Sequence, residues 1–430
     1  MIAQKRRHQR RIGLLSALLR LETARALRSP AFARAWSGQA LSRIGDVLFE
    51  IALAWWVLER TGSAALMATL LAVTFVPHLL LLLLGGVAGD RFNRITIMLV
   101  SDLLRAGVMG GVAVLAWFDL LQIWHLLMLN LIMGGVDAFF QPAYTAAVPD
   151  LVPDDDLPSA NALTSLSIQT GRIAGPALGA GMVALGGTAL AFTLNSLSFA
   201  IAAVLLLPLV RRRPTTQPTD PAPAAAPAPG LPAELRKGIA TVLTTPWLWI
   251  TILLFALTNV TLAGPYSVAL PFLVRDHWQA DVGTLGLLYA LFSVGYVLGG
   301  LWLGRRRRLR RRGRLVYGGI ALAGLMLLLF GLPVPVLLPA LGAVVNGAML
   351  EVSQMAWTTA VQQYVPREQL GRVAGMDALG SFALIPVGYA FTGWATEVLG
   401  APTVFVLGGG MTTLVALLLF AGCPAVRRLD

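Results

Sequence analysis

Long apolar runs, separated by short polar segments, make up most of the chain. Each run is close to the ~20 residues that an α-helix needs to cross the hydrocarbon core of a bilayer. Helices satisfy their own backbone hydrogen bonds, which lipid cannot do, so the pattern predicts an all-α integral membrane protein with twelve transmembrane helices. The spans are expected at 35–58, 66–89, 96–118, 122–144, 159–186, 189–209, 247–273, 282–303, 315–332, 334–361, 372–399 and 403–426.

The composition agrees with a chain that lies in the lipid bilayer. Of the 430 residues, 57% are hydrophobic and 13% are charged. The net charge of +12 could suggest nucleic acid, but the basic residues flank the apolar spans, so we expect no nucleic acid partner. The single cysteine, Cys423, excludes an internal disulfide and a cysteine-based metal cluster. We expect no metal and no cofactor.

Lysine and arginine predict the orientation of the spans. With the N-terminus inside, 28 of the 33 basic residues fall in cytoplasmic segments. Arg60 and Arg275 fall outside, and the other bases lie within spans. This positive-inside bias predicts a multi-pass protein of the plasma membrane with both termini in the cytoplasm.

A segment rich in proline and alanine, Pro214 to Pro232, separates two groups of six spans. This composition is typical of an extended linker. The basic start of the chain lacks a clean cleavage site, which favours an amphipathic helix on the inner leaflet over a signal peptide. The expected parts are a cytoplasmic basic N-terminal segment (1–34), an N-terminal six-helix bundle (35–210), a cytoplasmic linker (211–246), a C-terminal six-helix bundle (247–426) and a cytoplasmic tail (427–430).

The two groups of spans share short sequence patterns at a nearly constant offset. The segment 143–148 is similar to 356–361, and each is followed by Val-Pro at the same spacing, 213 positions apart. A Gly-x-x-x-Asp-Arg pattern at 86–91 corresponds to Gly-x-x-x-Gly-Arg at 300–305, 214 positions apart. Two matches at nearly the same offset indicate an internal duplication.

The turn between the second and third spans holds Gly86, Asp90, Arg91 and Arg94. Asn93 lies where a tight turn often requires a positive φ, and we expect it there. The turn resembles the loop signature of the major facilitator superfamily of transporters. That resemblance implies two six-helix pseudo-repeats and alternating access about a midplane site.

Asp102 and Arg105 stand one turn apart near the inner end of the third span. They lie close in sequence to the turn at 86–94. We expect the two sets of residues to form a network at a cytoplasmic gate.

The first span holds Arg43, Asp46 and Glu50 on one helical face. Charges in the hydrocarbon region are costly and usually face a bundle interior or a wet cavity. We therefore take Asp46 and Glu50 as candidates for the coupling proton, with Arg43 and with Arg172 of the fifth span as partners. A structural ion-pair network between the spans is the alternative.

The fifth span also carries small residues at Gly171, Gly175 and Gly179, with Pro176 among them. This stretch resembles the span-five antiporter motif of exporting members of the superfamily, which implies export. A face for close helix packing is the alternative.

The same resemblance implies that spans one, four, seven and ten line a central cavity. A polar side chain in a span is otherwise often an interhelical hydrogen bond, and that alternative stays open. The candidates for the substrate cavity are Asn130, Asp137, Gln141, Asn259, Tyr266, Glu351, Gln354 and Trp357.

The segment 36–46 is similar to the first span of exporters of the macrolide and enterobactin type. This implies a monomer that exports a small amphipathic molecule, such as an antibiotic, drug or siderophore, by proton antiport. Uptake or lysolipid transport by the same fold is the alternative. A membrane-integral enzyme or sensor is a further alternative, but the chain has no His-Glu-x-x-His pair and no phosphate-binding Gly-Lys-Ser/Thr loop, so we expect no enzyme.

Overall fold

The computed structural model describes residues 22–210, 239–305, 310–366 and 369–427. Within these ranges every regular element is a helix. Side chains at 82–83, 86–87, 89–90, 370–372 and 374 also lie outside the description. The basic segment before residue 22, most of the linker and the last residues of the tail lie outside the described residues.

The first half of the chain forms long helices joined by short turns. Its longest element, α6, is divided by a sharp kink, because Gly186 and Gly187 leave helical geometry and Gly187 has φ 69°. Glycine adopts this backbone conformation without strain. The elements are η1 (Glu22–Arg28), α2 (Pro30–Thr61), α3 (Ala64–Arg91), α4 (Arg94–Trp117), α5 (Ile123–Leu151), η2 (Asp154–Asp156) and α6 (Leu157–Val210).

The seventh span is less regular than the others. It begins as α8 (Pro246–Thr258) and continues through wide π-helical turns, η3 (Asn259–Ala263), η4 (Pro265–Ala269) and η5 (Leu273–His277), with a short α9 (Leu270–Phe272) between them. Pro265 and Pro271 lie in this stretch and lack the N–H groups that an α-helix needs there. Wide turns of this kind often mark functional sites.

The remaining helices follow the predicted spans closely. The eighth span was expected at 282–303, and the helix covers Val282–Gly304. The eleventh is interrupted between α13 and α14. The elements are α10 (Val282–Gly304), α11 (Arg312–Gly331), α12 (Leu337–Tyr364), α13 (Leu370–Phe382), α14 (Ile385–Leu399), α15 (Ala401–Gly422) and α16 (Pro424–Arg427).

Nine segments of the described chain are long and apolar enough to cross a membrane. One of them contains all of α6, which the kink at Gly186 divides into two spans. Two further helices, α2 and α12, are long enough but carry several polar and charged side chains. Together these helices agree with the predicted all-α protein of twelve membrane-spanning helices.

Contacts group the chain into two units, which we describe separately. Unit 1 contains 1–52, 74–175 and 185–221, and unit 2 contains 53–73, 176–184 and 222–430. Unit 2 thus includes the end of α2, the start of α3 and a short part of α6. The predicted division of the chain at the linker stays a prediction.

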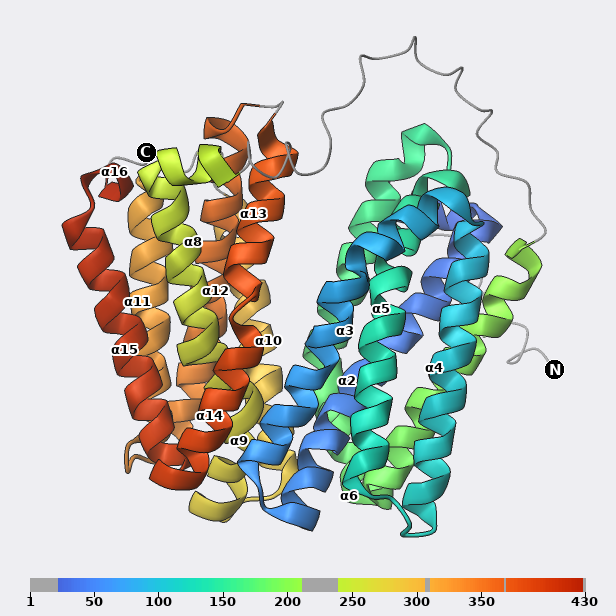
Figure 1. The fold of residues 1–430 in the computed structure, drawn as a ribbon, viewed down its shortest axis with the longest axis horizontal. Helices are drawn as coiled ribbons and strands as arrows, with labels where there is room; N and C mark the ends of the chain where they lie inside the picture. Colours follow the sequence, from blue (N-terminus) through green and yellow to red (C-terminus); the bar gives the residue numbers. More distant parts are fainter. Residues whose placement is uncertain (1–21, 211–238, 306–309, 367–368, 428–430) are drawn as a thin grey trace, which may run out of the picture. The chain divides into compact units, whose positions relative to one another are not determined.

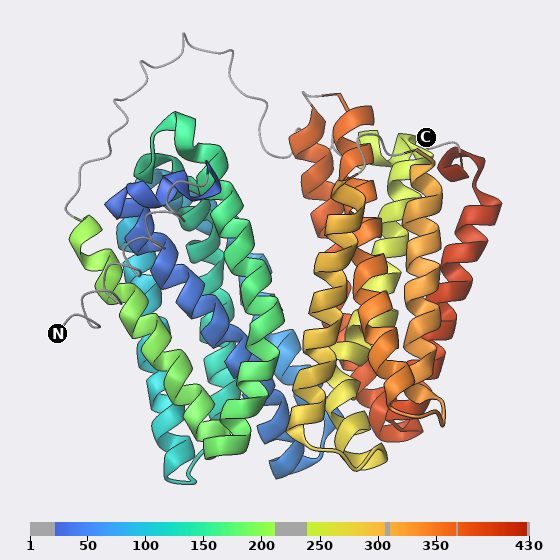
Figure 2. The ribbon, with the colours of Figure 1, turned by 180° about the vertical axis from the view of Figure 1, so that it is seen from behind.

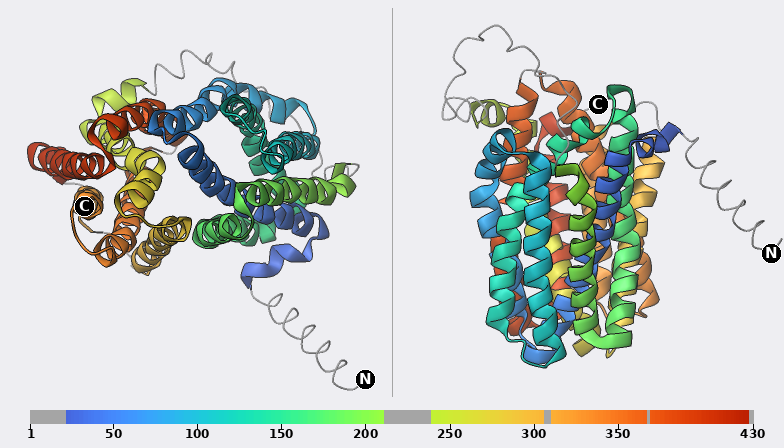
Figure 3. Two further views of the ribbon diagram at one scale, coloured as in Figure 1. Left: turned by 90° about the horizontal axis from the view of Figure 1, so that it is seen from below. Right: turned by 90° about the vertical axis from the view of Figure 1, so that its right-hand side faces the viewer.

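In unit 1, α4 and α5 lie side by side and enclose an apolar core with α2 and α6 (Figure 1). In unit 2, α11 packs against α15 and α12, and α10 packs along α12, as the gold and orange helices show from behind (Figure 2). Seen end-on, the helices within each unit run roughly parallel (Figure 3). Each unit therefore consists of packed, roughly parallel helices.

The duplication is visible in the three-dimensional structure. α5 ends at Leu151 and α12 ends at Tyr364, and these ends are again 213 positions apart. Gly134 of α5 faces the carbonyl of Thr74, and its counterpart Gly347 of α12 faces the carbonyl of Phe292. The same close helix approach thus occurs in both halves, as expected for six-helix pseudo-repeats.

Close contact between α10 and α12 depends on glycine. A Cβ atom placed on Gly295 would lie 1.9 Å from the carbonyl oxygen of Val344, so the two backbones could not keep their present distance. Small residues at such positions let membrane helices pack closely, where the hydrophobic effect does not drive association.

We expect Gly295→Ala to lower the free energy of unfolding by about 1–3 kcal/mol, the usual cost of overpacking. Gly318→Ala is the matched control, because nothing lies within 4 Å of a Cβ at that position of α11. The measurement is thermal or denaturant unfolding of the purified protein in detergent. Equal stability of the two variants would contradict the glycine contact.

Candidate functional site

Arg105 is the centre of a buried polar cluster in unit 1. Its Nη2 contacts Oδ1 of Asp137 on α5, and its Nη1 lies 3.9 Å from Oδ1 of Asp102 on the same helix. Gln39 of α2 donates from Nε2 to the other oxygen of Asp102 at 3.4 Å. The guanidinium also lies over the ring of Phe140, 4.4 Å from its centre. Arg105 thus joins α4 to α5, and Asp102 connects this pair to α2 through Gln39.

The exposure of these side chains differs sharply. The side chain of Asp102 is 0% exposed and that of Arg105 is 5% exposed, whereas that of Asp137 is 39% exposed. The Arg105–Asp137 pair therefore connects the interior of the unit with an accessible surface. The sequence assigned Asp137 to the substrate cavity and Asp102 with Arg105 to a gate, and the structure brings all three together.

The charges of the first span lie beside this cluster. Asp46 is partly buried, and the charges of Arg105, Asp137, Glu50 and Arg43 all act on it. Glu50 and Arg172 are both exposed, and the charge of Arg172 acts on Glu50. We call the connected set the unit 1 charge network: Arg43, Asp46, Glu50, Asp102, Arg105, Asp137 and Arg172.

The predicted gate turn lies between α3 and α4. Asn93 has φ −63°, so the expected positive φ is wrong. Its side chain instead caps α4 by accepting hydrogen bonds from the N–H groups of Ile95 at 2.9 Å and Thr96 at 3.2 Å. An asparagine satisfies orphan N–H groups at a helix start in this way without a left-handed backbone.

The arginines of the turn behave differently from each other. Arg91 is exposed, whereas Arg94 donates to the carbonyl of Ala146 at 3.1 Å and to Asp150 at 2.7 Å. Arg94 thus ties the start of α4 to the end of α5. The structure describes Gly86 and Asp90 only as positions in α3. Their expected role at the cytoplasmic gate stays a prediction.

The small residues of the fifth span lie in close contacts. In unit 1, a Cβ on Gly175 would lie 2.6 Å from Cβ of Val47, and Gly171 faces the backbone of Arg43. Gly179 is buried as well. In unit 2, Gly286 of α10 packs on the carbonyl of Pro176. This part of α6 is therefore a packing face, and a further role in antiport stays a prediction.

Two of the predicted cavity residues in the first half differ in environment. Asn130 is 3% exposed, accepts from the hydroxyl of Thr74 at 2.9 Å and donates to its own helix at Leu126. Gln141 is exposed. Asn130 makes the interhelical hydrogen bond that was the alternative interpretation, and a contact with substrate stays a prediction for both.

In the seventh span, Asn259 donates to the carbonyl of Ser381 on α13 at 2.8 Å. The buried ring of Tyr266 contacts the rings of Phe292, Phe330 and Phe405, with centroids 5.1, 5.6 and 6.5 Å away. These two residues hold the irregular span against its neighbours within unit 2.

The predicted cavity residues of α12 lie at different depths. Glu351 is partly buried and lies near Gly300 of α10, and Gln354 is exposed. Trp357 is 1% exposed, and its indole N–H donates to Asp377 of α13 at 2.9 Å. The hydroxyl of Ser381 donates to the other oxygen of Asp377 at 3.3 Å.

Unit 2 also contains a polar contact between α14 and the start of α3. Glu397 of α14 accepts from the hydroxyl of Ser63 and from the N–H of Ala65 at 3.0 Å. Nearby, Gly393 lies so close that a Cβ there would be 2.6 Å from Cβ of Ala68. A carboxylate at a helix N-terminus complements the helix dipole, which favours this α3–α14 contact.

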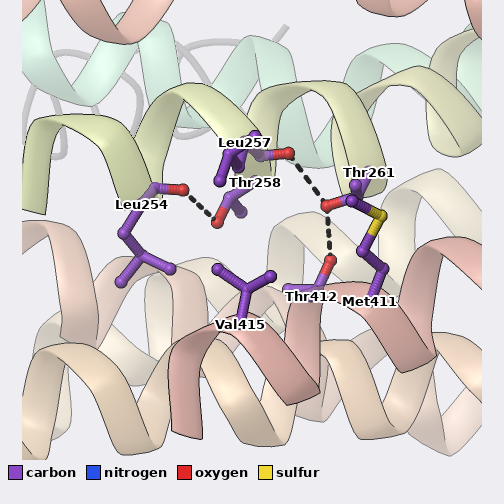
Figure 4. A pocket seen from close by; sticks show the side chains of 7 residues that line it. All are labelled: Leu254, Leu257, Thr258, Thr261, Met411, Thr412 and Val415. Atoms are coloured by element: carbon purple, nitrogen blue, oxygen red, sulfur yellow. Dashed lines mark hydrogen bonds between the residues drawn. The ribbon is translucent and has the colours of Figure 1, made fainter. Parts of the chain in front are cut away.

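A small polar contact between α8, η3 and α15 offers no ligand site. Thr261 and Thr412 share a hydrogen bond of 2.6 Å, and Leu254, Leu257, Met411 and Val415 fill the surroundings (Figure 4). The space that remains does not admit a water-sized molecule. We interpret it as interhelical packing.

Sequence reasoning missed several members of these sites. Asp377 lies within a predicted span, so the rule that selected Asp46 would have selected it too. The same rule applies to Glu397, which lies within the predicted span 372–399. Gln39 has no charge to mark it, and the partners of Gln39 and Glu397 lie 63 and 334 positions away in sequence. Among the described residues, no group of three or more His, Cys, Asp or Glu side chains is arranged to hold a metal ion.

Repeated halves of six helices, with charges gathered inside the spans, define a membrane transporter of the major facilitator superfamily. The chain belongs to the family whose model is described as a transmembrane secretion effector and matches residues 22–428.

Curated relatives cover nearly the whole chain. It is 24% identical over 409 residues to macrolide efflux protein A of Streptococcus pyogenes, covering 92% of this chain and 96% of the relative. It is 29% identical over 376 residues to the enterobactin exporter EntS of Shigella boydii, covering 84% and 86%. The relatives are membrane transporters, which agrees with a transporter rather than an enzyme.

Solved structures share the fold. A bacterial homologue of the iron transporter ferroportin in an inward-facing state has a TM-score of 0.67 at 15% identity, covering 91% of this chain and 98% of that one. The nucleoside transporter NupG has a TM-score of 0.65 at 13% identity, covering 91% and 98%. At these identities the likeness concerns the fold alone.

We expect Arg105→Gln to lower the free energy of unfolding by about 3–5 kcal/mol, because it leaves Asp102 as a buried charge without a cation. Adding Asp102→Asn to the same chain should restore part of the loss. Denaturant unfolding in detergent measures both effects, with exposed Arg91→Gln as the control. A double variant no more stable than Arg105→Gln alone would contradict the pairing.

Proposed function

We propose that the protein is a secondary active transporter that exports a small amphipathic molecule from the cell by proton antiport. It would work in the plasma membrane as a monomer, with both termini in the cytoplasm. The positive-inside distribution of Lys and Arg supports this orientation. The named cargoes of the relatives, macrolides and enterobactin, support an antibiotic or siderophore-like substrate.

The unit 1 charge network is the observation that carries the proton step. It contains four carboxylates and three guanidiniums, so one negative charge is in excess. An excess charge inside a membrane protein is costly, and binding one proton removes it. Two carboxylates, Asp137 and Glu50, act on Asp46, which makes Asp46 the group whose protonation relieves the most repulsion.

Protonation of Asp46 would change the competition for Arg105. A charged Asp46 attracts the same guanidinium that contacts Asp137 and Asp102. A neutral Asp46 leaves Arg105 to those two partners. Because the contacts around Arg105 and Asp102 include residues of α2, α4 and α5, the protonation state would then bias the arrangement of these helices, as a coupled transporter requires.

Alternating access also requires a contact that closes and opens. With the predicted orientation, the α3–α14 contact lies at the outer ends of its helices and holds together segments from the two sequence halves. We assign it the role of an outer gate that must separate for release of substrate.

The first experiment uses purified protein in vesicles with an imposed pH gradient. Macrolides and catecholate siderophores should trigger proton release through the protein. We expect the release to be lost in Asp46→Asn and weakened in Glu50→Gln, because each removes a titratable carboxyl from the network.

Glu59→Gln is the matched control for that experiment. Glu59 is exposed and accepts from the indole of Trp55 at 2.7 Å, and the variant should keep proton release. Unchanged release in both network variants would refute the proton role of the network. Net movement of substrate toward the side of the vesicle membrane that corresponds to the cytoplasm, in every arm, would favour uptake.

A second experiment follows the outer gate with one cysteine. Cys423→Ser removes the native thiol, and Ala64→Cys introduces a reporter at a side chain that is 1% exposed in the gate. We expect Glu397→Gln to speed maleimide labelling by about tenfold, the effect of losing a hydrogen bond to a charged group.

Gly393→Val should also speed labelling of the reporter, because its side chain cannot fit against Ala68. Gly111→Val is the control, since nothing lies within 4 Å of a Cβ there. Labelling that is slow in all variants would show that these residues do not hold the gate.

A further inference from the structure

The duplicated halves contain one equivalent side-chain pair whose charge differs. In the first half, the hydroxyl of Tyr144 on α5 shares a hydrogen bond of 3.2 Å with Thr164 on α6. In the second half, Trp357 donates to Asp377 at 2.9 Å. Both pairs span 20 positions, and each member lies 213 positions from its counterpart. A neutral hydroxyl in the first half thus corresponds to a carboxylate in the second.

Asp377 carries a negative charge that its hydrogen bond with Trp357 does not require. In the first half, the neutral hydroxyl of a threonine forms this hydrogen bond with the aromatic residue. The contact therefore does not require a charged partner. Within the described residues, no lysine or arginine lies within ion-pair distance of Asp377. A partly buried carboxylate inside a span is costly without a cation, which indicates a role that needs the charge.

The surroundings of Asp377 suit a cationic ligand. The rings of Trp247 and Phe255 have centroids 5.6 and 6.0 Å from that of Trp357, and both are only partly buried. Ring faces attract cations, particularly the face of tryptophan. Trp357 and Ser381 hold the two carboxylate oxygens in place, and an ionised carboxylate has further acceptor sites for a ligand.

We propose that Asp377 binds the positively charged group of the transported molecule, an ammonium or a related organic cation, beside the rings of Trp247 and Phe255. This rests on the proposed function and names its substrate class as cationic amphipathic molecules. The ligand supplies the positive charge that the described residues of the second half do not supply at this position. The ionised form of the carboxylate is the form that binds this ligand.

Equilibrium binding to the full-length protein in detergent tests the assignment with two probes of similar size and opposite charge, tetraphenylphosphonium and tetraphenylborate. We expect Asp377→Asn to weaken tetraphenylphosphonium binding by about tenfold or more, the effect of losing a charged partner. Asp377→Glu should retain most of the affinity. Tetraphenylborate binding should not weaken in any variant.

Asp377→Thr is the matched variant, because it places at position 377 the residue type that the first half has at the counterpart position, Thr164. It keeps an acceptor for Trp357, so it should unfold at the temperature of the wild type and still lose affinity for tetraphenylphosphonium. Equal affinity for tetraphenylphosphonium in the wild type, Asp377→Asn and Asp377→Thr would overturn the proposal.

Proton release separates this proposal from the proposed function. In Asp377→Asn, half-maximal proton release should require about tenfold more cationic substrate, and release should reach the wild-type level when the substrate saturates the protein. Loss of proton release even at saturating substrate would make Asp377 a proton carrier and overturn the assignment. Absence of transport in the wild type would refute the proposed function, whereas the binding experiment would still decide what Asp377 recognises.

Discussion

Arg105 carries a permanent positive charge where neither lipid nor an apolar core can stabilise it, and the arrangement of unit 1 follows from that constraint. Two carboxylates and two aromatic rings surround its guanidinium, and Gln39 of α2 donates to one of those carboxylates, Asp102. Removing one member of a buried ion pair would leave the other member's charge without a counter-charge. The loss of stability is then larger than the net contribution of the ion pair itself. The helices α2, α4 and α5 are therefore held in one relative arrangement by polar contacts, in addition to the small residues that let them approach.

The same constraint relates structure to transport. Under the proposed proton antiport, this network would bind and release one proton, and each of the two states would favour a different distribution of partners around Arg105. Glycine contacts such as Gly175 against Val47 keep the surrounding helices close, so a change of partner is passed to neighbouring helices through packed side chains. Unit 2 has no equivalent of Arg105 among its described span residues at the Asp377 site, and its polar contacts there are made by an indole and a hydroxyl.

The duplication shows which features the fold requires and which are free to differ. Gly134 and Gly347 are retained in both halves because a backbone carbonyl occupies the space that a side chain would need. Thr164 and Asp377 can differ because a hydroxyl and a carboxylate each form the hydrogen bond with the aromatic residue. Under the two proposals above, differences of this second kind would give the two halves separate tasks, the first in proton coupling and the second in substrate recognition.

The length of the apolar runs by itself determined the helical membrane fold and the position of nearly every span, because both depend on a local property of the backbone in lipid. The duplication followed separately from sequence matches at a nearly constant offset. The sequence also selected Asp46, Glu50 and Arg172, since a charge within a span is conspicuous. Only the tertiary structure decided which charges meet. Asp137 joins Arg105 from another helix, Glu397 caps a helix 334 positions away, and Asn93 caps α4 where a strained turn was expected. Which side chains pair depends on how the helices rotate and pack. The sequence shows which residues share a face of one helix, but it does not show which other helix that face contacts.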